Sequence, residues 1–151
     1  MDLPGALSSR LGLSPDQSEV LAAVVVGGLR FRVADELGEP IAGRLDAAIP
    51  ELQRWQRAGG LAAEIDAQRL AWQQNSRQSR DIALIAEVLY GLGAEPAGAD
   101  LVPDVVRAFL EDRLEPRTVK RLAQVAPFLT GSEATPVPTS RWRVASGGPP
   151  K

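Results

Sequence analysis

The stretch SPDQSEVLAAVVVGGLRFRVADEL, residues 14–37, decides the fold of this chain. Ser14 is a favoured helix N-cap, Pro15 suits the first helical position because no N–H donor is needed there, and Gln17 completes a capping box. The helix then continues until Gly38, a favoured C-terminal stop. Its middle part, VLAAVVVGGL, is apolar on every side, and a helix without a polar face has to be buried. The stretch therefore predicts a buried helix at the centre of an all-α fold.

Signals for further helices follow in the first half of the chain. A second helix is expected over residues 39–58, bent or broken before Pro50, because proline interrupts a helix interior. The pair Gly59-Gly60 then ends the first half.

The middle of the chain, residues 61–93, contains neither proline nor glycine before Gly91. Apolar residues recur there at helical spacing in two sets, which are Leu61, Ile65 and Trp72, then Leu84, Val88 and Leu92. A further helix is expected to start at Asp100, a candidate cap, with Pro103 in its first turn. The final helix is expected over residues 116–129.

Two segments of the chain resemble each other at a constant shift of 77 residues. When residues 24–52 are set against residues 101–129, eight of the 29 pairs are identical, where ordinary residue usage gives about two. The identical pairs are Val25/Val102, Arg30/Arg107, Asp35/Asp112, Leu37/Leu114, Arg44/Arg121, Leu45/Leu122, Pro50/Pro127 and Leu52/Leu129. Core residues recur in every copy of a repeat, whereas catalytic residues are rarely needed twice. The repeat therefore predicts architecture, in which an ion pair fastens the two helices of each unit, Asp35–Arg44 in the first and Asp112–Arg121 in the second.

The sequence thus predicts an all-α protein of two related helix-turn-helix units joined by a central helix, with a flexible C-terminal tail. The expected divisions are residues 1–58 for the first helical unit, 59–80 for the connecting helix or linker, 81–129 for the second helical unit and 130–151 for the disordered tail. The tail is rich in Pro, Gly, Ser and Thr and has no apolar period.

Residues 7–49 also carry a recognisable pattern, Leu-Gly-Leu-Ser-x-x-Gln, then a long apolar helix, then Pro-Ile-Ala-x-x-Leu. The residues that fit it are Leu11, Gly12, Leu13, Ser14, Gln17, Leu37, Pro40, Ile41, Ala42 and Leu45. This pattern resembles that of a group of small, uncharacterised bacterial all-helical proteins, a domain of unknown function, and residues 92–129 fit it more weakly. Gly38 stands where that group usually has proline. The resemblance implies a helical fold and supplies no mechanism.

The composition excludes several kinds of site. The chain has no cysteine and no histidine, which excludes disulfides, thiolate chemistry, and imidazole as a general base or metal ligand. An enzyme built from this chain would depend on carboxylates, Tyr90, Lys120 or a hydroxyl group. No catalytic motif joins such residues, and no Gly-rich phosphate loop is present. We therefore expect a protein that is not an enzyme and that uses no metal or cofactor.

Charge and hydropathy indicate the cellular location of the protein. The net charge of −2 gives no overall field that would favour nucleic acid or an anionic membrane. The longest apolar run, residues 20–29, is too short to span a bilayer, which takes about 20 residues. The N-terminus has no basic region followed by an apolar stretch, so no targeting signal is evident. The predominance of arginine over lysine is typical of a GC-rich bacterial genome, and we expect a soluble cytoplasmic protein.

Two sets of residues allow either a binding or a packing interpretation. Ala23 and Gly27 lie one turn apart and would suit the seam of a homodimer, or a close helix contact inside the chain's own core. Trp55 and Trp72 would suit an aromatic clamp for a ligand, but aromatic residues at helical spacing more often pack helices together. We favour packing for both sets and keep dimerisation as an open alternative.

The tail carries the strongest candidate for binding a partner. Residues 1–129 hold 14 basic and 18 acidic side chains, whereas residues 130–151 hold three basic and one acidic. Arg141, Trp142 and Arg143 stand together in this basic tail, and Trp and Arg are enriched at binding hot spots. We predict that these three residues bind a partner, although an end without any role fits the same sequence equally well.

As a whole, the sequence favours a non-catalytic interaction or assembly module that binds a protein partner or a second copy of itself. The alternative is nucleic-acid binding, with TVKRLAQVAPFL, residues 118–129, as part of a helix-turn-helix and the tail arginines on phosphates. The acidic helical body disfavours this alternative.

Overall fold

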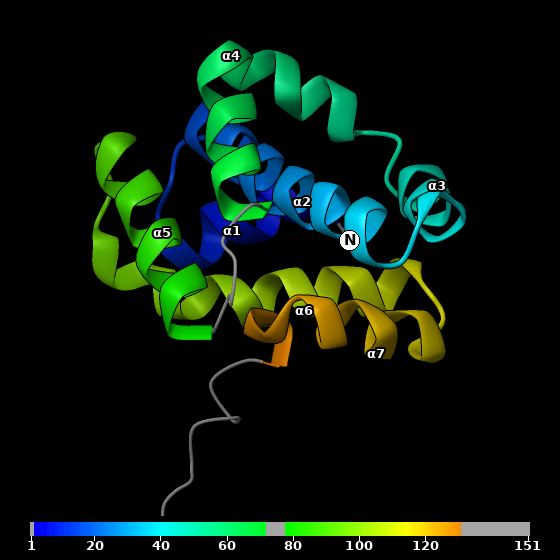
Figure 1. Cartoon of the computed structure of the whole chain (residues 1–151). Coiled ribbons are helices and arrows are strands. Elements are labelled where there is room, and N and C mark those ends of the chain that lie inside the picture. The colour runs from blue at the N-terminus through cyan, green and yellow to red at the C-terminus, as the bar shows by residue number, and fades with distance from the viewer. Residues whose placement is uncertain (1, 72–77, 131–151) are drawn as a thin grey trace, which may run out of the picture.

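A computed structural model describes residues 2–71 and 78–130 of the chain (Figure 1). This part is built of helices and contains no strand, so the predicted all-α class is confirmed. None of its helices is both long enough and apolar enough to cross a membrane. In chain order the elements are α1 (Leu3–Leu11), α2 (Pro15–Glu36), α3 (Glu39–Ala48), α4 (Leu52–Ala71), α5 (Gln78–Gly91), the 3₁₀ helix η1 (Pro96–Leu101), α6 (Val102–Arg113), α7 (Pro116–Val125) and the 3₁₀ helix η2 (Pro127–Thr130).

Helix α2 begins as predicted and lies at the centre of the body. The Ser14 hydroxyl accepts a hydrogen bond from the Gln17 backbone N–H at 3.1 Å, and the Gln17 side chain accepts from the Ser14 N–H at 2.9 Å. Residues 21–29 are all buried. In Figure 1, α2 crosses the middle of the molecule, with α4 on one side and α6 and α7 on the other. Helices α1, α3, α4, α5 and α7 all contact it.

The closest neighbour of α2 is α4, and two glycines allow the approach. A Cβ atom on Gly28 would lie 2.9 Å from the carbonyl oxygen of Ala67 and 2.9 Å from Cδ2 of Leu70. A Cβ atom on Gly27 would lie 3.2 Å from Cβ of Ala67. The two helices therefore meet through small residues, with almost no side chain between their backbones.

Helix α4 changes direction at the predicted glycine pair. Gly60 has φ 61° and ψ −151°, a conformation that is open to glycine and strained for other residues. The predicted break is confirmed, but the residues beyond it do not form a separate connector. Residues 61–71 turn back and lie along α2. Together with the rest of the chain they close one shared apolar core.

Three local expectations differ from the structure. Helix α1 was not expected, and it is capped by Asp2, whose side chain accepts from the Gly5 N–H at 2.9 Å. Asp100 lies inside η1 and does not cap α6, whose N-cap is Leu101. The last helix does not continue to residue 129, because Pro127 opens the separate turn η2 after α7 ends.

The two segments related by a shift of 77 residues have corresponding backbones. Helices α3 and α7 start and end 77 residues apart. Their C-caps also match, with φ −128° and ψ 68° at Ile49 and φ −132° and ψ 78° at Ala126. Leu45 and Leu122 are both fully buried. Local structure thus repeats with the sequence, and descent of the two segments from one duplicated unit stays a prediction.

The ion pair expected in both units does not form in the first. Among the described residues, no ion pair joins Asp35 to Arg44. Arg30 fastens α2 to α3 instead, with its guanidinium 3.0 Å from Asp46 and 3.3 Å from Glu39. The hydrogen bond to Asp46 raises the pKa of Arg30 above its ordinary value. Asp35 lies beside a surface pocket that Phe31, Ala34 and Ala71 also line.

A second polar junction joins α6 to the start of α4. Arg113 donates to Glu51 at 2.7 Å and to the Ala48 carbonyl at 3.0 Å, and its guanidinium lies 4.6 Å from the centre of the Phe109 ring. Phe109 in turn packs against Trp55, with ring centres 6.0 Å apart. The hydrogen bond from Arg113 lowers the pKa of the Glu51 carboxyl. At this junction the Arg113 guanidinium, the Phe109 ring and the Trp55 ring lie one after another and join the two halves of the chain.

We expect Gly28→Ala to destabilise the protein, because its new methyl group meets the α4 backbone. Overpacking of this kind costs about 1–3 kcal/mol, more than the gain in helix propensity. The matched control is Gly43→Ala, at an exposed position of α3 where a Cβ atom meets nothing within 4 Å. That change should raise the free energy of unfolding by up to about 1 kcal/mol. Urea unfolding measures both. Equal stabilisation by the two substitutions would mean that α4 does not lie against α2.

Candidate functional site on helix α4

The predicted binding residues of the tail, Arg141, Trp142 and Arg143, lie outside the described residues, and so does Trp72. Their prediction as partner-binding residues therefore stands as it was made from sequence.

The candidate dimer seam lies inside the chain. Ala23 and Gly27 are both buried, and α4 covers this side of α2. The close approach that their small size permits is thus made to a helix of the same chain, and a second copy cannot reach these residues while the body is folded. Trp55 is 0% exposed and packs on Phe109, so it has no face left for a ligand clamp. Ala23, Gly27 and Trp55 therefore belong to the core.

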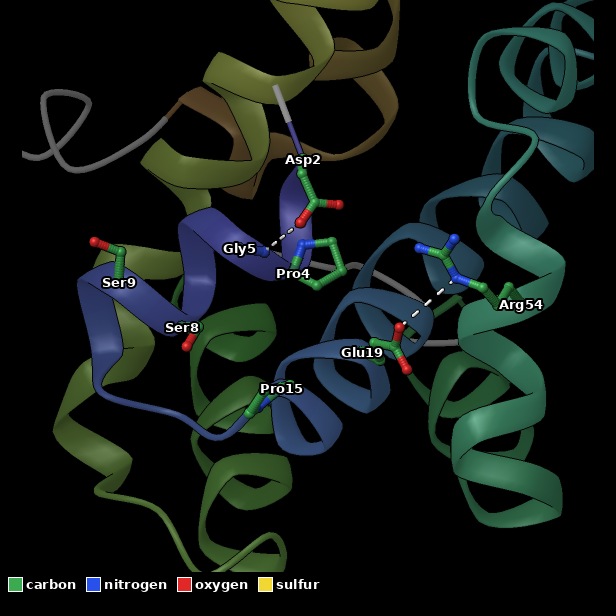
Figure 2. Close-up of a pocket in the computed structure, with 8 residues that line it drawn as sticks. All are labelled: Asp2, Pro4, Gly5, Ser8, Ser9, Pro15, Glu19 and Arg54. Carbon is green, nitrogen blue, oxygen red and sulfur yellow. Dashed lines mark hydrogen bonds and ion pairs between the residues drawn. The ribbon is translucent and has the colours of Figure 1, made fainter.

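A surface pocket of about 320 Å³ lies where α1 and the start of α2 face the first part of α4 (Figure 2). Its charged groups already have partners. Asp2 caps α1 by accepting from the Gly5 N–H, and Glu19 lies 3.7 Å from Arg54 across the pocket. Within residues 2–71 and 78–130, no group of three or more acidic side chains is placed to hold a metal ion. The pocket therefore offers no converging set of unpaired groups, and we assign no ligand to it.

A buried ion pair lies where four helices meet. Arg32 of α2 is 3% exposed and Asp81 of α5 is 0% exposed. Two nitrogens of the guanidinium each lie 3.2 Å from one carboxylate oxygen. Arg32 also donates to the carbonyl of Leu70, at the end of α4, and at 3.4 Å to the carbonyl of Val125, at the end of α7. One side chain thus holds together the ends of three other helices.

This pair is structural rather than catalytic, because no substrate reaches a carboxylate that is completely buried. Asp81 also sits in the first turn of α5, where a negative charge is favoured by the helix dipole. The sequence contained a partial signal, since Arg32 is a charged residue within an apolar helix. Its partner is 49 residues away, a separation that no local pattern reveals.

Two large apolar side chains of α4 are exposed in the described part of the chain. Leu61 is 70% exposed and Ile65 is 49% exposed, one turn apart on the second part of α4. The side of this segment that faces α2 carries Ala63, Ala67 and Leu70 instead. Ala67 lies against Gly27 and Gly28, where the close approach of the two helices leaves little room for a larger side chain. We call Leu61, Glu64, Ile65 and Gln68 the α4 outer face, since these exposed residues share one side of the helix.

Charges border the α4 outer face unequally. Arg69 is held by two carboxylates, Asp66 at 3.1 Å and Glu87 of α5 at 3.2 Å. Glu64 is exposed and has no ion-pair partner among the described residues. On α5, Tyr90 is 75% exposed and adds a second apolar surface one turn beyond Glu87. The surface thus combines aliphatic side chains with an excess of negative charge.

The sequence identified the residues of this face but not their exposure. The spacing of Leu61 and Ile65 predicted an apolar helix face, and such a face is ordinarily buried. In the structure Leu61 and Ile65 are exposed, whereas Leu84 and Val88 of the second set are buried.

Comparison with family models, with curated proteins and with solved structures finds no match for this chain. The resemblance to uncharacterised bacterial helical proteins therefore stays a prediction, and the functional argument depends on the chain's own residues.

We expect Arg32→Met to cost about 3–5 kcal/mol of unfolding free energy, because it leaves the buried Asp81 carboxylate without its partner. The double variant Arg32→Met/Asp81→Leu should recover part of this loss, since no buried charge then remains unpaired. Recovery is incomplete because two carbonyl groups still lose their donor. A double-mutant cycle in urea measures the coupling.

The matched control is Arg30→Met, which removes the half-exposed pair with Asp46 and should cost at most about 1 kcal/mol. If Arg32→Met proves as mild as this control, the buried pair does not hold the helix ends together.

Proposed function

We propose that this chain is a non-catalytic protein–protein interaction module of the cytoplasm, and that its partner binds the α4 outer face. The observation that carries the proposal is the exposure of Leu61 and Ile65 on a helix whose opposite side is packed in the core. Most large apolar residues of the described chain are buried, so this pair is an exception that a binding role explains.

The rigidity of the surface supports a docking role. Residues 63, 67 and 70 anchor this segment of α4 against α2, so the outward side chains are displayed on a fixed helical frame. A surface that is ordered before binding loses little conformational entropy when a partner arrives. Neighbouring anchors one turn apart are also the spacing by which helices engage one another.

The charge beside the apolar pair indicates the chemistry of the partner. Glu64 is uncompensated, and Arg69 is occupied by two carboxylates. A partner segment that places an aliphatic or aromatic residue next to a basic residue therefore complements this surface. A partner segment with an acidic residue at that place is disfavoured, because its negative charge would meet that of Glu64.

Photo-crosslinking in cells that naturally express the chain tests the proposal. A photoreactive residue in place of Gln68, on the outer face, should capture a specific protein. The same residue in place of Ala47, exposed on α3, should not. Adding Leu61→Ser and Ile65→Ser should lower the Gln68 product at least about tenfold, the change that about 1.4 kcal/mol of lost binding produces. Identical products from both positions, unaffected by the serines, would exclude the face as a docking surface.

A second candidate, nucleic-acid binding, is favoured by the exposed side of α7. Arg117, Lys120 and Arg121 are exposed there at helical spacing, and none has an ion-pair partner among the described residues. Three cations on one helix side can neutralise phosphates together, although the acidic body opposes approach.

Duplex DNA distinguishes this candidate from the first. If the three cations contact phosphates, affinity should fall about 40-fold between about 50 and 200 mM salt, and Lys120→Ala with Arg121→Ala should flatten that dependence. Fluorescence anisotropy measures both. Weak binding that the alanines leave unchanged rules out the α7 surface as a nucleic-acid site.

A further inference from the structure

We infer that the partner of the α4 outer face is the exposed side of α7 in a second copy of the chain, so that copies join head to tail. This inference rests on the proposed function, since it names the partner of the same face. The contact accounts for two exposed surfaces at once, the apolar and acidic face of α4 and the basic side of α7.

The α4 outer face carries an excess of negative charge. The carboxylates of Glu64, Asp66 and Glu87 lie on or beside it, and the Arg69 guanidinium is bonded to the last two. With three negative charges and one positive charge, these four groups have a net charge of −2. A partner that binds here therefore has to bring positive charge with it.

The exposed side of α7 supplies that positive charge. Arg117, Lys120 and Arg121 are exposed there, and none of them has an ion-pair partner among the described residues. Glu115, the exposed N-cap of the same helix, is the nearest acidic residue in the sequence. With three positive charges and one negative charge, these four groups have a net charge of +2, which complements the α4 outer face.

The same basic side chains suit the apolar part of the face. Arginine and lysine carry long aliphatic stems that cover apolar surface while their charged ends remain free to pair. A stem can therefore pack on Leu61 or Ile65 while its charged end bonds to the Glu64 carboxylate between them.

The two surfaces also share one helical spacing. The exposed residues of the α4 outer face are Leu61, Glu64, Ile65 and Gln68, and those of α7 at the same spacing are Arg117, Lys120, Arg121 and Gln124. Residues separated by three, four and seven positions form one stripe along a helix. Two such stripes can lie along each other as packed helices do.

The position of the two surfaces in the body sets the form of the assembly. In Figure 1, α4 lies on one side of α2 and α7 lies on the other. A contact between these different surfaces leaves one free surface of each kind on every pair, so further copies can add. The contact therefore predicts an open chain or a ring of copies.

A two-fold contact between identical α4 outer faces is disfavoured. It brings two Glu64 carboxylates to one interface, where Arg69 is already held by Asp66 and Glu87. Like charges that meet without compensation oppose the contact. The head-to-tail arrangement sets negative charge against positive charge instead.

The contact is small, because each surface consists of four side chains. Stable interfaces between separate proteins bury at least about 1,200 Å² in total, and smaller ones are transient. We therefore expect an assembly that depends on protein concentration.

Sedimentation velocity of the full chain over a range of concentrations tests the inference. The mean mass should rise with concentration in about 0.1 M salt and fall back towards the monomer in about 1 M salt, because the Debye length shrinks from about 10 to about 3 Å. A chain that stays monomeric throughout overturns the inference, and so does an assembly that salt leaves unchanged.

Two double variants locate the contact. Leu61→Ser with Ile65→Ser, and separately Lys120→Ala with Arg121→Ala, should each lower the association constant at least about tenfold, the change that about 1.4 kcal/mol of lost binding produces. The matched control is Arg44→Ala, exposed on α3 at the position that corresponds to Arg121 in the repeat, and it should leave association unchanged. All these residues are exposed, so the fold should persist, which circular dichroism checks.

Mixing the two double variants tests the head-to-tail arrangement. Each variant alone has lost one surface and should stay monomeric. In the mixture, the native α7 of the serine variant meets the native α4 outer face of the alanine variant, so a 1:1 pair should form and add no further copies. A mixture that stays monomeric overturns the inference. Assembly of the alanine variant by itself also overturns it, because α7 is then not the partner.

The outcome separates this inference from the proposed function. A monomeric chain whose outer face still captures another protein at Gln68 in the photo-crosslinking experiment removes the inference and leaves the proposed function standing. A chain that assembles as expected, while Gln68 captures only further copies of the same chain, supports the inference and removes an outside partner.

Discussion

The burial of the middle of α2 on every side is the constraint on which the rest of the structure depends. Its residues 21–29 present no polar face, so each side of the helix has to be covered by another part of the chain. Helix α4 covers the glycine side at close range, and α1, α3, α5 and α7 contact the remaining sides. The two segments that share a sequence pattern therefore form one core instead of two independent units.

Polar ties fix how the surrounding helices meet around α2. Arg32 follows the apolar stretch of that helix and forms an ion pair with Asp81 of α5. It also donates hydrogen bonds to carbonyl groups at the ends of α4 and α7. Arg113 makes a comparable junction on α6, where Glu51 and an aromatic ring share its guanidinium. Apolar packing alone tolerates sliding of one helix along another, whereas these directional bonds specify one arrangement.

The α4 outer face is a consequence of the same packing. Because α2 offers glycines to α4, the inner side of α4 carries alanines, and Leu61 and Ile65 are left outside. Spacing identified these two residues as part of one apolar helix face, but hydrophobicity by itself predicts the opposite orientation for that face. In the same way, the small residues Ala23 and Gly27 allow a close contact whose partner the sequence does not specify, and that partner proves to be α4 of the same chain.

The sequence by itself determined the helical class, the capped start of α2, the break before Pro50 and the corner at Gly60, because these depend on backbone preferences of neighbouring residues. It also determined the absence of imidazole and thiol chemistry. Tertiary structure alone decided which apolar residues face inward, which carboxylate pairs with Arg32, and that Arg30 rather than Asp35 fastens α2 to α3. Those outcomes depend on contacts between residues far apart in the chain, where shape and distance, not local periodicity, select the partner.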